Sequence, residues 1–173
     1  MKKLIDECKK GKQKARKELY HRYNEILMRI CLRYSKNEFE AEDILMEGFM
    51  KIFSKIQSYS YNGSFEGWMK TIVVHVAIDY FRKNKNENDH QDIDNYSHLP
   101  YDHTDALNQL SSLEILTLIQ SLPEGYRIVF NLFAIEGFSH KEIADKLQIT
   151  ESTSRSQLRK ARLWLMKKMD DRY

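Results

Sequence analysis

The sequence has little proline, glycine or cysteine and no long hydrophobic run. Its 2 Pro and 6 Gly are too few for the many turns of a β-sandwich and supply little glycine for a dinucleotide-binding fold. The longest apolar stretch, residues 72–78, is interrupted by His75 and is much shorter than the roughly 20 residues that cross a bilayer. No apolar signal-peptide segment follows Met1. We therefore expect an all-α, cytoplasmic protein.

The only cysteines are Cys8 and Cys31, too few for a disulfide framework or a structural zinc site. We expect both to be reduced thiols.

Charge is distributed unevenly along the chain. Residues 1–36 hold 12 Lys and Arg against 4 Asp and Glu, a net charge of +8, and residues 151–173 carry +4. Residues 86–107 hold six acidic residues and no Lys or Arg, and they show neither helical nor strand periodicity. This pattern predicts two small helical domains, 1–86 and 109–173, joined by an acidic flexible linker at 87–108.

In the first module, apolar residues recur at three- and four-residue spacing within 19–31, 41–56 and 68–81. This spacing predicts amphipathic helices that bury one face each in a small bundle. Trp68 falls in phase with the buried face of the third helix. Asp43 and Glu47 fall on the outer face of the second, which by itself is typical of a solvated polar surface.

The segment 57–68 alternates aromatic with small polar residues, and its two glycines and asparagine oppose a continuous helix. Aromatic faces on a loop stack on unpaired bases with about 1 to 3 kcal/mol each, and short polar groups bond to base edges. The ordinary alternative is a hydrophobic lid over the core. The candidate base-binding residues are Tyr59, Ser60, Tyr61 and Asn62, with Arg82 and Lys83 as candidates for phosphate contact.

The second module contains a predicted helix-turn-helix. Ser139 and Glu142 have the spacing of a capping box, residues 148–150 form a short turn, and Thr150 is placed to cap the next helix. An inward apolar stripe that includes Leu158, Ala161 and Leu165 leaves a polar and basic outer face that fits a major groove. The alternative is a solvated basic helix. The outer face consists of Ser152, Arg155, Ser156, Gln157, Arg159, Lys160 and Arg162.

Taken in order, these features resemble the extracytoplasmic-function (ECF) group of the sigma-70 family, the small two-domain sigma factors of bacterial RNA polymerase. Residues 41–49 are similar to the family's helix that grips the polymerase clamp, and 57–68 with 77–83 are similar to its promoter-melting segment. Residues 122–127 and 138–144 are similar to its module for the upstream promoter element, and Thr153 lies at a recognition-helix position.

The resemblance implies a sigma factor with region 2 in residues 1–86 and region 4 in 109–173. It implies core RNA polymerase binding through Asp43 and Glu47, at the clamp and flap, and reading of a −35 element by the second helix of the helix-turn-helix. The −10 element would be melted by the 57–68 loop, with Phe65 and His75 close to the bases. The implied partners are promoter DNA and an anti-sigma factor, in particular a membrane protein with a cytosolic inhibitory domain. No cofactor, metal, small-molecule substrate or catalytic residue is implied.

Three positions depart from the family pattern. Gln148 replaces a usual glycine, which predicts an altered or strained turn. Ser154 replaces a usual apolar residue, which predicts loose packing at the start of the recognition helix. His75 replaces a frequent Asn, which affects the expected downstream base preference.

Two other functions are compatible with parts of the sequence. The His and Asp residues of the acidic segment are of metal-ligand type, but the segment has no apolar periodicity to hold ligands in place. A sigma mimic that occupies an anti-sigma factor, or a helix-turn-helix repressor, would bind its target without initiating transcription. Promoter-dependent transcription with added core polymerase distinguishes these binding proteins from a sigma factor.

Overall fold

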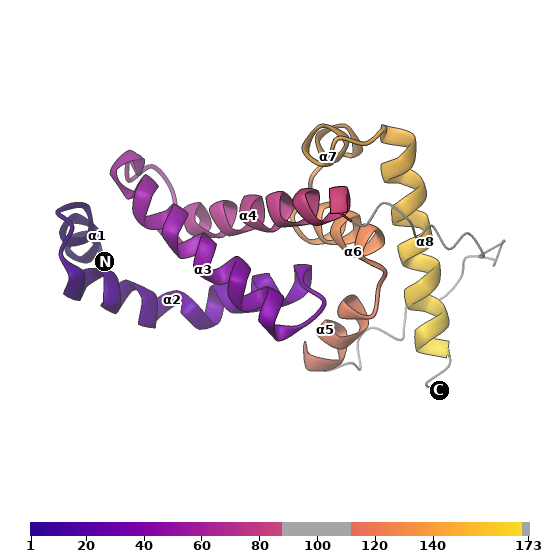
Figure 1. The fold of residues 1–173 in the computed structure, drawn as a ribbon, viewed down its shortest axis with the longest axis horizontal. Helices are drawn as coiled ribbons and strands as arrows, with labels where there is room; N and C mark the ends of the chain where they lie inside the picture. Colours follow the sequence, from indigo (N-terminus) through magenta and orange to yellow (C-terminus); the bar gives the residue numbers. More distant parts are fainter. Residues whose placement is uncertain (88–111, 171–173) are drawn as a thin grey trace. The chain divides into compact units, whose positions relative to one another are not determined.

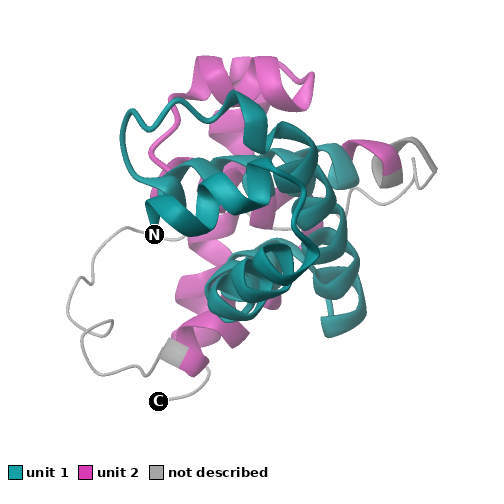
Figure 2. Ribbon diagram, turned by 90° about the vertical axis from the view of Figure 1, so that its left-hand side faces the viewer, with its two compact units in different colours: residues 1–81 teal, residues 82–173 magenta. Residues whose placement is uncertain are grey.

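The computed structural model describes residues 1–87 and 112–170, and within them it contains helices and no strand (Figure 1), which confirms the all-α prediction. The chain divides at Phe81 into two compact units, coloured separately in Figure 2. Helix α4 continues to Glu87, one residue past the predicted domain boundary. The rest of the predicted linker, with the His and Asp residues considered as metal ligands, lies outside the described residues.

Unit 1 is built from four helices and a 3-10 turn. Gly11 (φ +75°) follows α1, and the Asn37 side chain caps α3 by accepting a hydrogen bond from the Glu40 backbone N–H at 2.9 Å. The elements are α1 (Lys2–Lys9), α2 (Gln13–Tyr34), α3 (Glu38–Lys55), η1 (Ile56–Ser58) and α4 (Phe65–Glu87).

The core of unit 1 is formed by the predicted apolar faces. Leu27, Ile52 and Val73 from α2, α3 and α4 are all fully buried. Helices α3 and α4 approach closely at Gly48, where an added Cβ would lie 3.0 Å from Val73 Cγ2. The bundle therefore holds both ends of the 59–64 loop on fixed helices.

Unit 2 contains α5 (Ser112–Gln120), α6 (Glu124–Phe130), the π-helical turn η3 (Asn131–Ile135), α7 (His140–Leu147) and α8 (Glu151–Asp170). Leu132, Ile143 and Ala161 are fully buried where α7 and α8 pack onto α6 and η3. Gly137, which follows η3, has a left-handed conformation, with φ +79°. The π-helical turn was not predicted.

Two residues of unit 2 have a burial unusual for their type. Leu113 is 75% exposed, whereas α5 turns other residues, including Leu118, to the core. Arg127 is buried, and its Nη1 donates hydrogen bonds to the carbonyls of Gln120 (3.1 Å) and Leu122 (3.2 Å). It thereby ties the end of α5 to α6.

Within residues 1–87 and 112–170, no helix is long and apolar enough to cross a bilayer. The same residues bring together no group of three or more His, Cys, Asp or Glu side chains able to hold a metal ion.

Candidate nucleic-acid and polymerase interfaces

The predicted capping box opens α7. The Ser139 Oγ accepts from the Glu142 backbone N–H at 3.3 Å, and Glu142 Oε2 accepts from the Ser139 N–H at 2.8 Å and from its hydroxyl at 2.7 Å. These hydrogen bonds from Ser139 hold the pKa of the Glu142 carboxyl below its ordinary value. The start of the helix-turn-helix is therefore fixed by its own sequence.

The turn between α7 and α8 is strained in the way that its missing glycine predicts. Gln148 is in the left-handed region (φ 54°, ψ 47°), a conformation that L-residues adopt at a cost. The Ile149 N–H donates to the Ala144 carbonyl at 3.1 Å, and Thr150 Oγ1 accepts from the Thr153 N–H at 3.1 Å. Thr150 thus caps α8 as predicted.

Ser154 does not pack loosely, which corrects the sequence-based expectation. Its side chain is fully buried, and its Oγ lies 2.9 Å from His140 Nδ1. The His140 ring in turn stacks on Phe133, with ring centroids 4.5 Å apart. Burial, and then the nearby Arg155 charge, lower the pKa of His140. A polar pair therefore joins α7 to α8 where an apolar contact was expected.

The outer face of α8 is available to a partner. Its exposed members include Arg155, which donates to Glu151 at 2.8 Å, and Arg159. Gln157 is half-buried because its amide lies against Gly125, where an added Cβ would be 3.2 Å from Nε2. The other exposed residues are Ser152, Ser156 and Arg162, with Thr153 and Lys160 half-buried.

The loop between η1 and α4 separates the candidate aromatic residues into two groups. Tyr59 is only 6% exposed, its hydroxyl donates to the Gly63 carbonyl at 2.9 Å, and its ring contacts Phe65 and Trp68. Phe65 is equally buried and stacks on Trp68 at 5.5 Å. Tyr59 and Phe65 therefore form the hydrophobic lid of the alternative interpretation, and Trp68, which was predicted to lie in the core, is half-buried against them.

Tyr61 lies on the outer side of this loop. It is 36% exposed and has a left-handed backbone (φ 63°), and its hydroxyl donates a hydrogen bond to the Asp6 carboxylate of α1. That hydrogen bond raises the pKa of Tyr61 to about 12. Lys9 Nζ lies 4.5 Å from the ring centroid. Ser60 and Asn62, on either side, are exposed.

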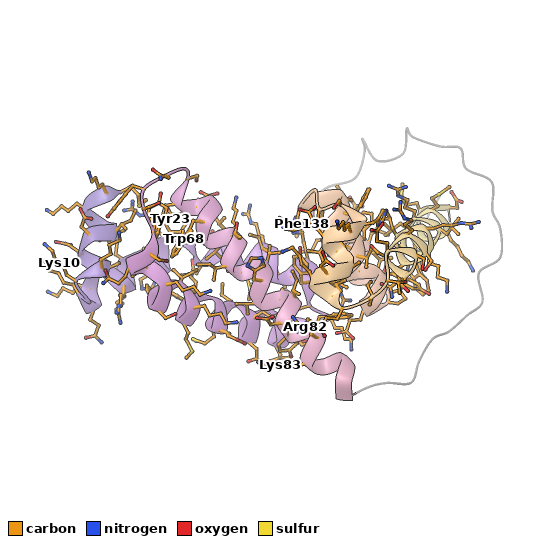
Figure 3. The ribbon with its side chains drawn as sticks, turned by 90° about the horizontal axis from the view of Figure 1, so that it is seen from above. Lys10, Tyr23, Trp68, Arg82, Lys83 and Phe138 are labelled. Carbon is orange, nitrogen blue, oxygen red and sulfur yellow. The ribbon has the colours of Figure 1, made fainter. Side chains whose placement is uncertain are left out.

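Farther along α4, His75 is exposed, and Arg82 and Lys83 lie on the last turns of the helix, where Figure 3 labels them. Tyr23 and Trp68, also labelled there, belong to the aromatic cluster at the start of α4. The structure therefore distributes the candidate melting residues along the whole of α4 and the loop before it.

On α3, Asp43 is exposed as predicted, whereas Glu47 is engaged by a neighbour. Lys51 Nζ lies 3.2 Å from the Glu47 carboxylate and 3.1 Å from that of Asp79. Desolvation opposes the charge on Lys51, but the hydrogen bonds that Lys51 donates to Asp79 and Glu47 outweigh it and raise the lysine pKa.

Three exposed apolar side chains of α3 were missed by the sequence analysis. Phe39 is 79% exposed, Met46 60% and Met50 66%. With Asp43 they follow one another at spacings of four, three and four residues, so they share the helical face opposite the core. The signal was present in the sequence as apolar residues out of phase with the buried stripe. We call Phe39, Asp43, Met46 and Met50 the α3 outer stripe.

Comparison with known proteins gives matches to both units. The family described as Sigma-70 region 2 matches residues 19–87, and Sigma-70, region 4 matches residues 112–165. The chain is 30% identical over 182 residues to the ECF RNA polymerase sigma factor SigW of Bacillus subtilis (strain 168), covering 99% of this chain and 97% of that protein. It is 28% identical to the ECF RNA polymerase sigma-E factor of Escherichia coli (strain K12), over 92% and 88% of the two chains.

Among solved structures, the sigma factor RpoE of Bartonella quintana, determined in complex with the anti-sigma factor NepR, is similar with a TM-score of 0.49 and 21% identity. The match covers 87% of this chain and 96% of that one.

Proposed function

Because the chain belongs to the ECF group of the sigma-70 family, whose members are sigma factors of transcription initiation, we propose that it reads a −35 element with α8 and melts a −10 element with the η1–α4 loop. Residues 1–86 then act as region 2 and residues 109–173 as region 4. The observation that carries the proposal is the capped helix-turn-helix with a buried inner stripe and an exposed arginine face on α8.

For the −35 element, Arg159 reads a base edge and Lys160 contacts phosphate. Arg159 is supported by its exposure, and Lys160 by its half-buried position 6.0 Å from the Tyr126 ring, which keeps its charge close to the helix. Arg159→Ala should cost about 1 to 3 kcal/mol at the preferred sequence and relax the preference there. Lys160→Ala should weaken all sequences alike and lower the salt slope by about 1. Equal, sequence-independent losses in both variants would contradict base reading by Arg159.

For the −10 element, Tyr61 is the aromatic side chain of the loop that a flipped base can reach, since Tyr59 and Phe65 are buried. Ser60 and Asn62 supply the polar groups that contact base edges, while Arg82 and Lys83 hold the backbone and His75 lies along the path of the strand. Tyr61→Ala should leave duplex binding unchanged and reduce permanganate reactivity of promoter thymines. Unchanged reactivity would exclude Tyr61 from melting.

Core RNA polymerase binds the α3 outer stripe with its clamp, and unit 2 meets the flap. The stripe supports this because it places three large, exposed apolar side chains around one carboxylate. Exposed apolar patches of this kind mark surfaces that bind another protein. Met46→Glu should weaken core binding at least about tenfold, which is 1.4 kcal/mol. His21→Glu, an exposed position on α2, adds the same charge and serves as control. Equal affinities for the two variants would place the clamp contact elsewhere.

The regulatory partner is an anti-sigma factor, a membrane protein whose cytosolic domain covers the α3 outer stripe and so blocks the polymerase. Family membership supports the partner, and the exposed stripe supplies a surface whose occupation would inhibit. Membrane proteins that co-purify with the chain are identified, and their cytosolic domains are purified. At least one of these domains should compete with core polymerase for binding to the wild-type chain. If none of them competes, this mode of control is rejected.

A further inference from the structure

Helix α1 and the turn after it are strongly basic, and they lie beside the loop that carries Tyr61 (Figure 1). Residues 1–17 hold eight Lys and Arg against Asp6 and Glu7, a net charge of +6 in a chain whose total is +3. The bundle itself does not need these charges, because the inner face of α1 is formed by the buried side chains of Leu4, Ile5 and Cys8.

Hydrogen bonds connect this helix to the loop. Lys9 Nζ donates to the Tyr59 carbonyl at 2.7 Å, and Gln57 Nε2 donates to the Lys9 carbonyl. Asp6 accepts the Tyr61 hydroxyl hydrogen bond. The basic helix and the aromatic loop therefore form one continuous surface.

The two acidic residues of α1 are occupied by neighbours. Asp6 is bound by Tyr61, and Glu7 pairs with Lys12 at 3.1 Å, a hydrogen bond that also lowers the pKa of the Glu7 carboxyl. Lys3 and Lys10 are exposed, and neither forms an ion pair with any residue in the described part of the chain. Their positive charge is therefore directed to solvent or to an anionic partner.

We propose that Lys2, Lys3, Lys9 and Lys10 form a phosphate-binding rim for the single DNA strand whose base stacks on Tyr61, an inference that rests on the proposed melting function and extends it. Lys2 and Lys9 have Nζ atoms 5.6 and 4.5 Å from the Tyr61 ring centroid. A nucleotide stacked on that ring places its phosphates within a Debye length of about 8 Å from the rim.

The geometry favours a single strand over a duplex. Tyr61 offers a ring that only an unpaired base can stack on, and the rim lies next to that ring on the same surface. Each phosphate neutralised by a lysine of the rim releases condensed counterions. Each such contact therefore adds about 0.7 to the magnitude of the slope of log binding constant against log salt concentration.

The test uses the full chain and a fluorescein-labelled single-stranded DNA of about 16 nucleotides, with anisotropy titrations from about 50 to 200 mM NaCl. The double variant Lys3→Gln/Lys10→Gln removes two charges that do not contact Tyr61. Its control, Arg29→Gln/Lys36→Gln, removes one charge near the far end of α2, where Arg29 lies about 24 Å along the helix axis from Gln13, and one just after that helix ends at Tyr34.

We expect the rim variant to lower the magnitude of the salt slope by about 1.4 and the control to leave it unchanged. Equal slopes for wild type and rim variant, or equal losses in rim variant and control, would each overturn the proposal. Tyr61→Ala should reduce affinity with no change in slope, which separates stacking from phosphate contact.

The proposed sigma function is tested separately by run-off transcription with core polymerase. A wild-type chain that starts no promoter-dependent RNA refutes that function whatever the slopes are. A slope unchanged in the rim variant, together with normal transcription, refutes only the assignment of α1.

Discussion

Replacing Gln148 by glycine should stabilise unit 2, because the residue is held in the left-handed region at φ 54° and ψ 47°. A residue with a Cβ pays about 1 to 2 kcal/mol for that conformation. Glycine avoids this penalty but loses about 0.5 to 1 kcal/mol more backbone entropy on folding. The exposed glutamine side chain has no hydrogen bond among those of the described residues. The expected gain is therefore about 0.5 to 1 kcal/mol in the free energy of unfolding.

The assay is urea unfolding of the full chain followed by Trp164 fluorescence. The chain has 2 Trp, Trp68 in unit 1 and Trp164 in α8, so a Trp68→Phe background reports on unit 2. Asp145→Gly is the matched control, because Asp145 is an exposed position inside α7, where glycine costs about 0.3 kcal/mol more than aspartate. The urea midpoint should rise for Gln148→Gly and fall for Asp145→Gly. A fall in both would show that the turn is not left-handed at Gln148.

Three other predictions concern stability. Burial lowers the pKa of His140, so as pH falls below the ordinary value of 6.5 the unfolded chain takes up the proton first and the free energy of unfolding of unit 2 decreases. Urea midpoints between about pH 7.5 and 5.5 should show a smaller pH slope in His140→Asn, and identical slopes would count against this. Ser139→Ala should cost about 1 kcal/mol in the same assay through loss of the cap of α7, and no shift would mean that the box is not formed. Leu27→Ala, at a fully buried position of unit 1, should cost about 2 to 5 kcal/mol when followed by Trp68 fluorescence, and a cost below about 1 kcal/mol would contradict the packing.

The sequence predicted the helical fold and the local signals of the helix-turn-helix with good fidelity. The Ser139 capping box, the Thr150 cap and the buried positions Leu158 and Ala161 depend on short-range spacing, and all four are present in the structure. Short-range rules are reliable here because a cap or an amphipathic stripe involves residues within one or two turns of each other.

Contacts between elements far apart in the sequence do not follow from such short-range rules. The hydrogen bond between His140 and Ser154 joins two helices, and Ser154 was expected to pack loosely because only its residue type was visible. The exposure of Tyr61 beside the buried Tyr59 depends on α1, more than fifty residues away in the sequence, which binds the Tyr61 hydroxyl through Asp6. From the alternation of aromatic and polar residues alone, Tyr59 and Tyr61 are equally good candidates for base stacking.

The α3 outer stripe is a different case, since its pattern was readable. Met46 and Met50 are apolar and out of phase with the buried face, but an exposed apolar residue is common on any surface. Their significance appears only when the structure shows them together with Phe39, all three more than half exposed on one face.

Run-off transcription with purified core RNA polymerase is the most direct test of the sigma assignment. The DNA templates are enriched by selection for binding to the complex of this chain with core polymerase. We predict RNA that starts at one position on the enriched templates, requires the chain, and decreases with Arg159→Ala at the −35 element and with Tyr61→Ala at the melting step. Binding of the chain to core polymerase or DNA without RNA synthesis on any enriched template would contradict the account.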